Sequence, residues 1–153
     1  MCSSDLGATN TAALRRTSGT AATVPANYAT TSNNNLFYAG TPGSNNLLYT
    51  EGTVTTFTNS MQTLADLRTF MVNRDQASVT ENPTFISTTG SNASFLHINT
   101  SIATQIESGA LPAGSVTLDF DGDTRNVSTP DIGADEGNFV LADVTPPTIT
   151  YTT

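Results

Sequence analysis

Short apolar runs separated by Asn, Gly, Pro and Ser recur along this chain. The clearest case is a near repeat: residues 34–38 are Asn-Asn-Leu-Phe-Tyr and residues 45–49 are Asn-Asn-Leu-Leu-Tyr, with Pro42 and Gly43 between them. Asn suits a tight bend and Pro-Gly a turn, while the apolar runs suit buried strands. The pattern indicates either stacked coils of turn and strand or an ordinary hairpin, and these residues favour neither.

Several further segments are typical of short strands. Residues 53–58 alternate imperfectly between Thr and apolar side chains, and apolar runs occur within 82–86, 95–98 and 116–120. Loops of Gly, Ser and Asn separate them, as expected for strands joined by turns. Thr is abundant throughout and favours strands because it is β-branched. The sequence therefore predicts an all-β fold.

A single segment changes the period. Four apolar residues within 63–72 fall on one face of a helix: Leu64, Leu67, Phe70 and Met71. Thr63 is placed to cap the N-terminus of that helix, and Asp66 occupies the position from which a capping-box carboxylate reaches back. The pattern predicts one short helix near 63–72, and we interpret its apolar stripe as packing.

The charge of the chain disfavours some classes of partner. The formal net charge is −8, and the five basic residues are all Arg, of which only Arg15 and Arg16 are adjacent. A nucleic-acid binder needs clustered cations to displace counterions from phosphates, so nucleic acid is disfavoured. Anionic polysaccharides are disfavoured unless cations bridge them, while neutral polysaccharides remain compatible. No apolar run predicts a membrane span, and the single Cys2 allows no internal disulfide.

The two ends of the chain differ from the middle. Residues 1–6, Met-Cys-Ser-Ser-Asp-Leu, resemble the translation of a sequencing-adapter tail, and we interpret them as a non-native artefact. Within 139–153, Pro146 and Pro147 precede an alternating segment, which predicts a linker and the first strand of a sandwich module. The domain expected between them covers 7–138, and we expect an export signal to lie upstream.

Six of the thirteen acidic side chains fall within residues 119–136. Asp119, Asp121 and Asp123 alternate, so on an extended strand their carboxylates could together bind a hard cation such as Ca²⁺. Their spacing departs from that of an EF-hand loop, in which position 130 would be Glu rather than Pro. The alternative is a structural cap in which carboxylates accept backbone N–H bonds and pair with an arginine. The residues of that cap would be Arg125, Asp131, Asp135 and Glu136.

The sequence predicts no catalytic residue. His97 is the sole imidazole, and on a strand it would face away from Leu96 and Ile98, so we expect a surface side chain. No cysteine nucleophile, phosphate-binding loop or zinc-ligand spacing is evident. A polysaccharide lyase needs a proton abstractor, and Arg serves poorly because it stays protonated.

Several motifs follow one another in a characteristic order, at 34–40, 74–79, 82–85, 95–98 and 104–109. Two acidic motifs come after them: Asp-Phe-Asp-Gly-Asp-Thr-Arg-Asn at 119–126 and Pro-Asp-Ile-Gly-Ala-Asp-Glu at 130–136. In this order they resemble the last coils of right-handed parallel β-helix (pectate-lyase-like) proteins of the surface of Bacteroidetes-type bacteria. Residues 143–151 resemble the entry into bacterial immunoglobulin-like modules. The resemblance implies stacked coils whose open end is covered by the helix and the acidic segment.

The resemblance also implies a secreted protein of the cell surface. The segment would be structural or adhesive and without catalysis, capping the β-helix and joining upstream coils to downstream immunoglobulin-like modules of the same chain. A neutral or cation-bridged polysaccharide is the expected partner. The alternative is the non-catalytic end of a polysaccharide lyase or glycosidase whose active groove lies on earlier coils. Calcium at Asp119, Asp121 and Asp123 is the one cofactor that the residues suggest.

Overall fold

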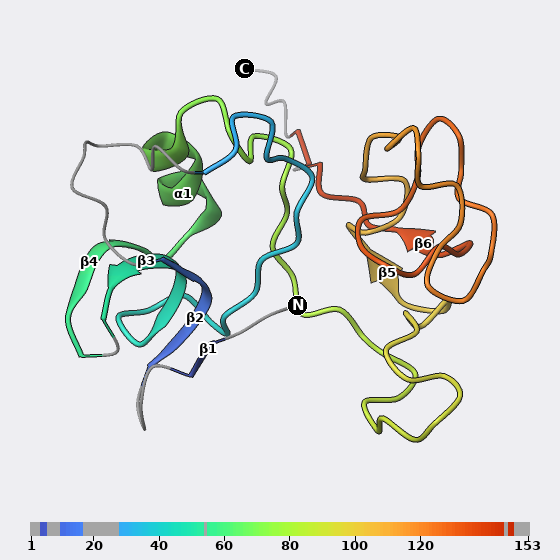
Figure 1. The fold of residues 1–153 in the computed structure, drawn as a ribbon, viewed down its shortest axis with the longest axis horizontal. Helices are drawn as coiled ribbons and strands as arrows, with labels where there is room; N and C mark the ends of the chain where they lie inside the picture. The colour runs from blue at the N-terminus through green and yellow to red at the C-terminus, as the bar shows by residue number, and fades with distance from the viewer. Residues whose placement is uncertain (1–3, 6–9, 17–27, 54, 146, 149–153) are drawn as a thin grey trace, which may run out of the picture.

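The computed structural model describes residues 4–5, 10–16, 28–53, 55–145 and 147–148. The regular elements of these residues are short strands and one helix, so the fold is dominated by β-structure, as the sequence predicts. Figure 1 shows two lobes, one with a larger sheet and the helix and one with a two-stranded sheet; the chain passes from the first to the second through the extended segment that follows α1. The strand expected within 149–151 lies outside the described residues, as does most of 1–6.

The first lobe is built on a four-stranded sheet in the order β1-β2-β3-β4. The strands are β1 (Ser4–Asp5), β2 (Thr11–Arg16), β3 (Asn46–Gly52) and β4 (Phe57–Met61). β2 and β3 run parallel, with Ala12 opposite Leu47, whereas β1 and β4 pair antiparallel at the two edges. β3 is buried over nearly its whole length because it lies between two partners and under the helix.

A turn occupies part of the segment 53–58, in which the sequence predicts a strand. The N–H of Thr53 donates to the carbonyl of Thr56 at 3.0 Å, and strand pairing starts only at Phe57. Gly52 has a φ of +105°, and a Cβ at this position would clash with the Thr56 carbonyl. Only glycine fits this conformation, so the turn that follows Gly52 overrides the alternation of the next four residues.

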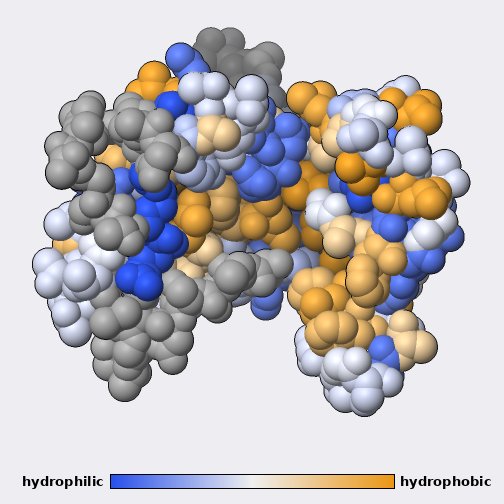
Figure 2. Space-filling model, in the orientation of Figure 1, coloured by the Kyte–Doolittle hydropathy of each residue, from blue (hydrophilic) through white to orange (hydrophobic). Residues whose placement is uncertain are grey.

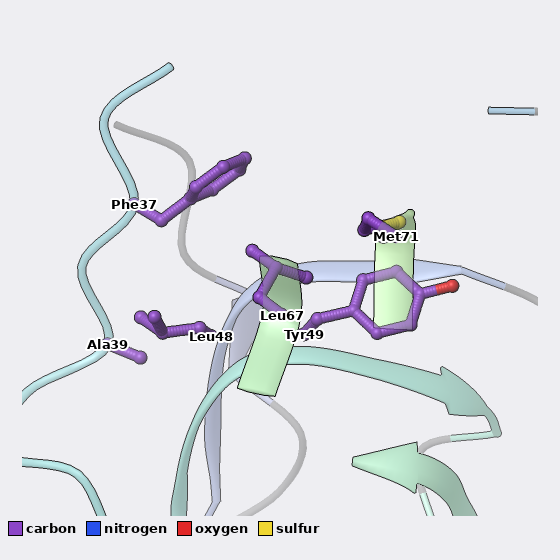
Figure 3. Packing of buried hydrophobic residues seen from close by; sticks show 6 residues of the cluster. All are labelled: Phe37, Ala39, Leu48, Tyr49, Leu67 and Met71. Atoms are coloured by element: carbon purple, nitrogen blue, oxygen red, sulfur yellow. The ribbon is translucent and has the colours of Figure 1, made fainter. Parts of the chain in front are cut away.

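The helix α1 (Leu64–Met71) confirms the prediction for 63–72. The Thr63 hydroxyl accepts the N–H of Asp66 at 3.2 Å, and the Asp66 carboxylate accepts the N–H of Thr63 at 3.3 Å, which completes the expected capping box. Leu67 and Met71 are fully buried and face Tyr49 of β3 (Figure 3). The apolar stripe of the helix therefore packs on the sheet, as interpreted from the sequence.

Two extended segments lie side by side between the lobes: the one around Leu36 runs on into β3, and the one around Val79 runs on into the second lobe (Figure 1). Leu36 pairs in parallel with Val79, and the N–H of Phe37 donates to the Val79 carbonyl at 3.0 Å. The Asp75 carboxylate is fully buried beside this pairing and accepts from the Tyr28 hydroxyl at 2.8 Å and from the Asn35 amide at 2.8 Å. These bonds fasten the first segment to the second.

The near repeat of the sequence does not form a hairpin. Its first half, at 34–38, pairs with Val79, whereas its second half belongs to β3 and pairs with β2 and β4. The two halves are local equivalents with different partners, because pairing across the chain, and not the Pro-Gly turn between them, decides where each half lies.

The second lobe contains β5 (Ala103–Thr104) and β6 (Val140–Leu141), which pair in parallel. Its core consists of Ile98, Ile106, Ile132 and Phe139. The N–H of Ala142 donates to the Thr104 carbonyl at 3.0 Å, so the chain remains hydrogen-bonded to this lobe as far as Ala142. The connection from β5 to β6, which is described throughout, contains no helix.

The strands expected at 95–98 and 116–120 are reduced to isolated bridges, namely Phe85 with Ile98, Ser87 with Phe95, and Leu118 with Thr124. α1 lies in the first lobe and the acidic segment 119–136 in the second, so they do not jointly cover one end (Figure 1). Neither sheet closes on itself among the described residues.

Candidate functional site

A pocket of about 260 Å³ opens between residues 34–36 and the second lobe. Apolar side chains form most of its wall, including Leu36, Phe85, Phe95, Phe120 and Ile132. Figure 2 shows apolar surface in the centre of the viewed face, where the lobes meet, and over much of the second lobe. Three ionisable side chains interrupt the apolar lining of the pocket: His97, Asp121 and Asp135.

His97 reaches this pocket because the backbone turns at the residue before it. Leu96 has a φ of +61°, and its N–H donates to the Ser87 carbonyl at 2.8 Å. The carbonyl of His97 accepts from the N–H of Ile86 at 2.8 Å, which fixes the segment against its neighbour. Since the left-handed residue breaks the strand alternation, the imidazole turns toward the acidic segment and is only 30% exposed. The sequence predicts a surface side chain, and the structure leaves His97 partly exposed beside the acidic segment.

The imidazole of His97 lies between two carboxylates. Its Nε2 is 3.2 Å from Oδ2 of Asp121, and its Nδ1 is 3.6 Å from Oδ1 of Asp135. One donor atom from each of the three residues lies within 4.8 Å of the others. The second oxygen of Asp135 accepts the N–H of Ile98 at 2.7 Å, which orients that carboxylate toward the pocket. The three side chains come from three separate segments and meet only in the folded chain.

Asp119 organises the turn that carries Asp121. Its Oδ1 accepts the N–H groups of Asp121 at 2.9 Å and Asp123 at 2.8 Å, and its Oδ2 accepts the N–H of Glu136 at 3.0 Å. Burial opposes the charge of this carboxylate, but the backbone N–H bonds outweigh it and lower the pKa of Asp119. The oxygens of Asp119 bind backbone N–H groups in this structure, and a calcium ion at Asp119, Asp121 and Asp123 stays a prediction from the sequence.

Asp131 fixes the path by which the chain leaves the acidic segment. It is 1% exposed, and its carboxylate accepts the N–H of Ser108 at 2.7 Å and the N–H of Gly137 at 2.9 Å. Burial raises the pKa of Asp131, and the two N–H bonds lower it in part. The carboxylate thereby ties the end of the acidic segment to the turn near Ser108.

Arg125 and Glu136 add to the hydrogen bonds of Asp131, and we call these three residues together the Asp131 clamp. Arg125 Nη1 donates to the Gly133 carbonyl at 3.0 Å, and its Nη2 lies 3.4 Å from Oε2 of Glu136. Glu136 in turn accepts the N–H groups of Asn126 at 2.9 Å and Asp131 at 3.0 Å. The guanidinium therefore closes the loop between positions 125 and 136 from the inside, with its side chain only 12% exposed.

The predicted site residues thus divide into two groups. Arg125, Asp131 and Glu136 meet in one hydrogen-bonded clamp, whereas Asp135 points away from it toward His97. The three alternating aspartates do not converge as one ligand set in the described part of the chain: Asp121 turns to His97, and Asp123 is exposed. No signal along the sequence places His97 with Asp121 and Asp135, because strand alternation directs it elsewhere.

The local charge of the pocket is not balanced by arginine. Burial raises the pKa of Asp135, and the charges of Asp119 and Asp121 act in the same direction, against the Ile98 N–H bond and the charge of His97. Among the described residues no arginine pairs with Asp121 or Asp135. Among the described residues, His97 is therefore the only basic side chain that lies within ion-pair distance of the two carboxylates.

Within the described residues, no helix has the length and apolar character needed to cross a membrane. No protein-family model, no curated protein and no solved structure matches this chain.

Proposed function

We propose that this chain is a non-catalytic structural or adhesive segment of an extracellular, cell-surface protein. In this proposal the segment forms the terminal coils of a right-handed parallel β-helix, caps them, and joins upstream coils to downstream immunoglobulin-like modules. The partner is a neutral or cation-bridged polysaccharide, which suits a chain of net charge −8 without lysine.

The observation that carries this proposal is the repeated parallel pairing of segments far apart in sequence. β2 pairs in parallel with β3, Leu36 with Val79, and β5 with β6. Parallel partners in α/β folds are usually connected through a covering helix, but the connection from β5 to β6 has none. Parallel pairing through irregular loops is typical of solenoids, in which each coil pairs with the next.

The Asp131 clamp supports the capping role. A stack of coils ends in unpaired backbone groups, and a cap must bind them or shield them from other chains. Here Asp131, Glu136 and Asp119 bind backbone N–H groups of the last turns. A loop held by side chains offers no regular row of donors and acceptors to a second chain.

The proposal is tested by comparing this chain with a longer product in which the proposed upstream coils precede it. The longer product should be monomeric and melt at a higher temperature, since each coil buries the apolar face of its neighbour. The chain alone should associate through its uncovered end in analytical ultracentrifugation. A monomeric chain with a cooperative melt at the same temperature as the longer product would overturn the proposal.

Incubation of the longer product with neutral polysaccharides distinguishes adhesion from catalysis. We expect retention of the protein on the polysaccharide without new reducing ends. The matched control is the longer product that lacks residues 28–143. Cleavage that disappears in this control would assign chemistry to the segment and contradict the non-catalytic role.

A further inference from the structure

The pocket that contains His97 also contains Asp121 and Asp135, three side chains that the proposed structural role does not use. Two carboxylates face the imidazole in a partly buried pocket: Oδ2 of Asp121 lies 3.2 Å from Nε2, and Oδ1 of Asp135 lies 3.6 Å from Nδ1. The cost of close like charges falls when a cation sits between them. Each of the five arginines of the chain donates to other groups: Arg15 to Gly52, Arg16 to Glu51, Arg68 to Ser78, Arg74 to Tyr28, and Arg125 to Gly133.

We propose that His97, Asp121 and Asp135 form a binding site for a divalent transition-metal ion of the Zn²⁺ type. The donor set is one imidazole nitrogen and two carboxylate oxygens, all within 4.8 Å of one another. A tetrahedral ion with ligand bonds of about 2.0–2.2 Å places its donors roughly 3.3–3.5 Å apart. The observed 3.2 Å between Nε2 of His97 and Oδ2 of Asp121 is close to this spacing. Asp135 contacts the other ring nitrogen, Nδ1, at 3.6 Å, and its carboxylate would complete the set from within 4.8 Å.

The surroundings of the three side chains suit a metal site. The Ile98 N–H holds the second oxygen of Asp135 at 2.7 Å, which is the kind of outer contact that orients a ligating carboxylate. Asp119 fixes the backbone of Asp121 through a bond of 2.9 Å to its N–H. The pocket of about 260 Å³ leaves room for the water or ligand oxygen that completes the coordination.

The donor chemistry selects the class of ion. Calcium takes six to eight oxygen ligands and rarely uses imidazole, whereas imidazole with carboxylates suits zinc and its neighbours. This site is therefore distinct from the calcium site expected at Asp119, Asp121 and Asp123, with which it shares only Asp121. The alternative occupant of the space is a proton, which would make His97 an imidazolium paired with both carboxylates.

Isothermal titration of the whole chain with Zn²⁺ alone tests the site, using protein without a histidine tag and with Cys2→Ser, so that the thiol cannot bind the metal. We expect one Zn²⁺ per chain, and we expect His97→Ala and Asp135→Asn each to weaken binding by about tenfold or more. Asp123→Asn is the matched control, since that carboxylate is exposed and lies outside the donor set, and it should change the Kd less than about twofold.

Two further measurements keep the outcome clear. His97→Gln should keep the circular dichroism spectrum and the melting temperature of the metal-free chain while losing zinc affinity, so that misfolding cannot imitate loss of a ligand. Ca²⁺ in place of Zn²⁺ should bind at least about tenfold more weakly. Absence of binding at millimolar Zn²⁺, or Zn²⁺ affinity that is unchanged by His97→Gln, would overturn the proposal and leave the imidazolium pair as the role of these residues.

Discussion

The replacement Asp131→Ala is expected to destabilise the chain more than any other substitution in the acidic segment. Asp131 is 1% exposed and accepts backbone N–H groups of Ser108 at 2.7 Å and Gly137 at 2.9 Å. Its removal leaves the N–H groups of both residues without this buried, charged acceptor. At about 1–3 kcal/mol for each hydrogen bond to the carboxylate, the free energy of unfolding should fall by about 2–6 kcal/mol.

This loss is large for a domain whose total stability is about 5–15 kcal/mol. Urea denaturation followed by circular dichroism measures it directly, and amide hydrogen exchange locates it. The amides of Ser108 and Gly137 should exchange faster in Asp131→Ala, while amides in α1 change little because the helix belongs to the other lobe.

Two variants bracket the prediction. Asp131→Asn keeps one acceptor oxygen but turns an NH₂ group toward the other N–H, so about half of the loss should remain. Asp123→Asn alters an exposed carboxylate and should stay within about 0.5 kcal/mol of the unmodified chain. If Asp131→Ala also stays within that margin, the carboxylate does not hold the chain exit, and the capping role loses its main physical support.

Two further predictions concern the first lobe and the two extended segments beside it. Leu67→Ala should lower the free energy of unfolding by about 2–5 kcal/mol because Leu67 is fully buried, whereas Leu111→Ala, at a position 69% exposed, should change it little. Urea denaturation measures both variants, and equal losses would contradict the assigned core. Burial raises the pKa of Tyr28 from 10.0 to about 12. The protonated hydroxyl therefore contributes fully to the free energy of unfolding below pH 10, and this contribution is lost as pH rises through 12. Unfolding followed between pH 9 and 12 should show this loss, and Tyr28→Phe should reduce it; an equal pH dependence in both proteins would refute the assignment.

The helix shows how far local pattern reaches. Its boundaries, its capping box and its buried face follow from residues within one another's reach along the chain: Thr63 meets Asp66, and Leu67 and Met71 lie one turn apart. The short strands were predicted less well, because a segment such as 95–98 or 53–58 becomes a strand only if a partner is aligned with it.

The sequence by itself determined the β-dominated composition, the helix, the acidity and the concentration of carboxylates in residues 119–136. Only the tertiary structure decided what each carboxylate does. Asp119 and Asp131 bind backbone N–H groups, whereas Asp121 and Asp135 turn to His97. The left-handed backbone at Leu96 and the folding of the acidic segment onto it bring these groups together. Such contacts depend on where distant segments pack, which the spacing of residues along the chain does not encode.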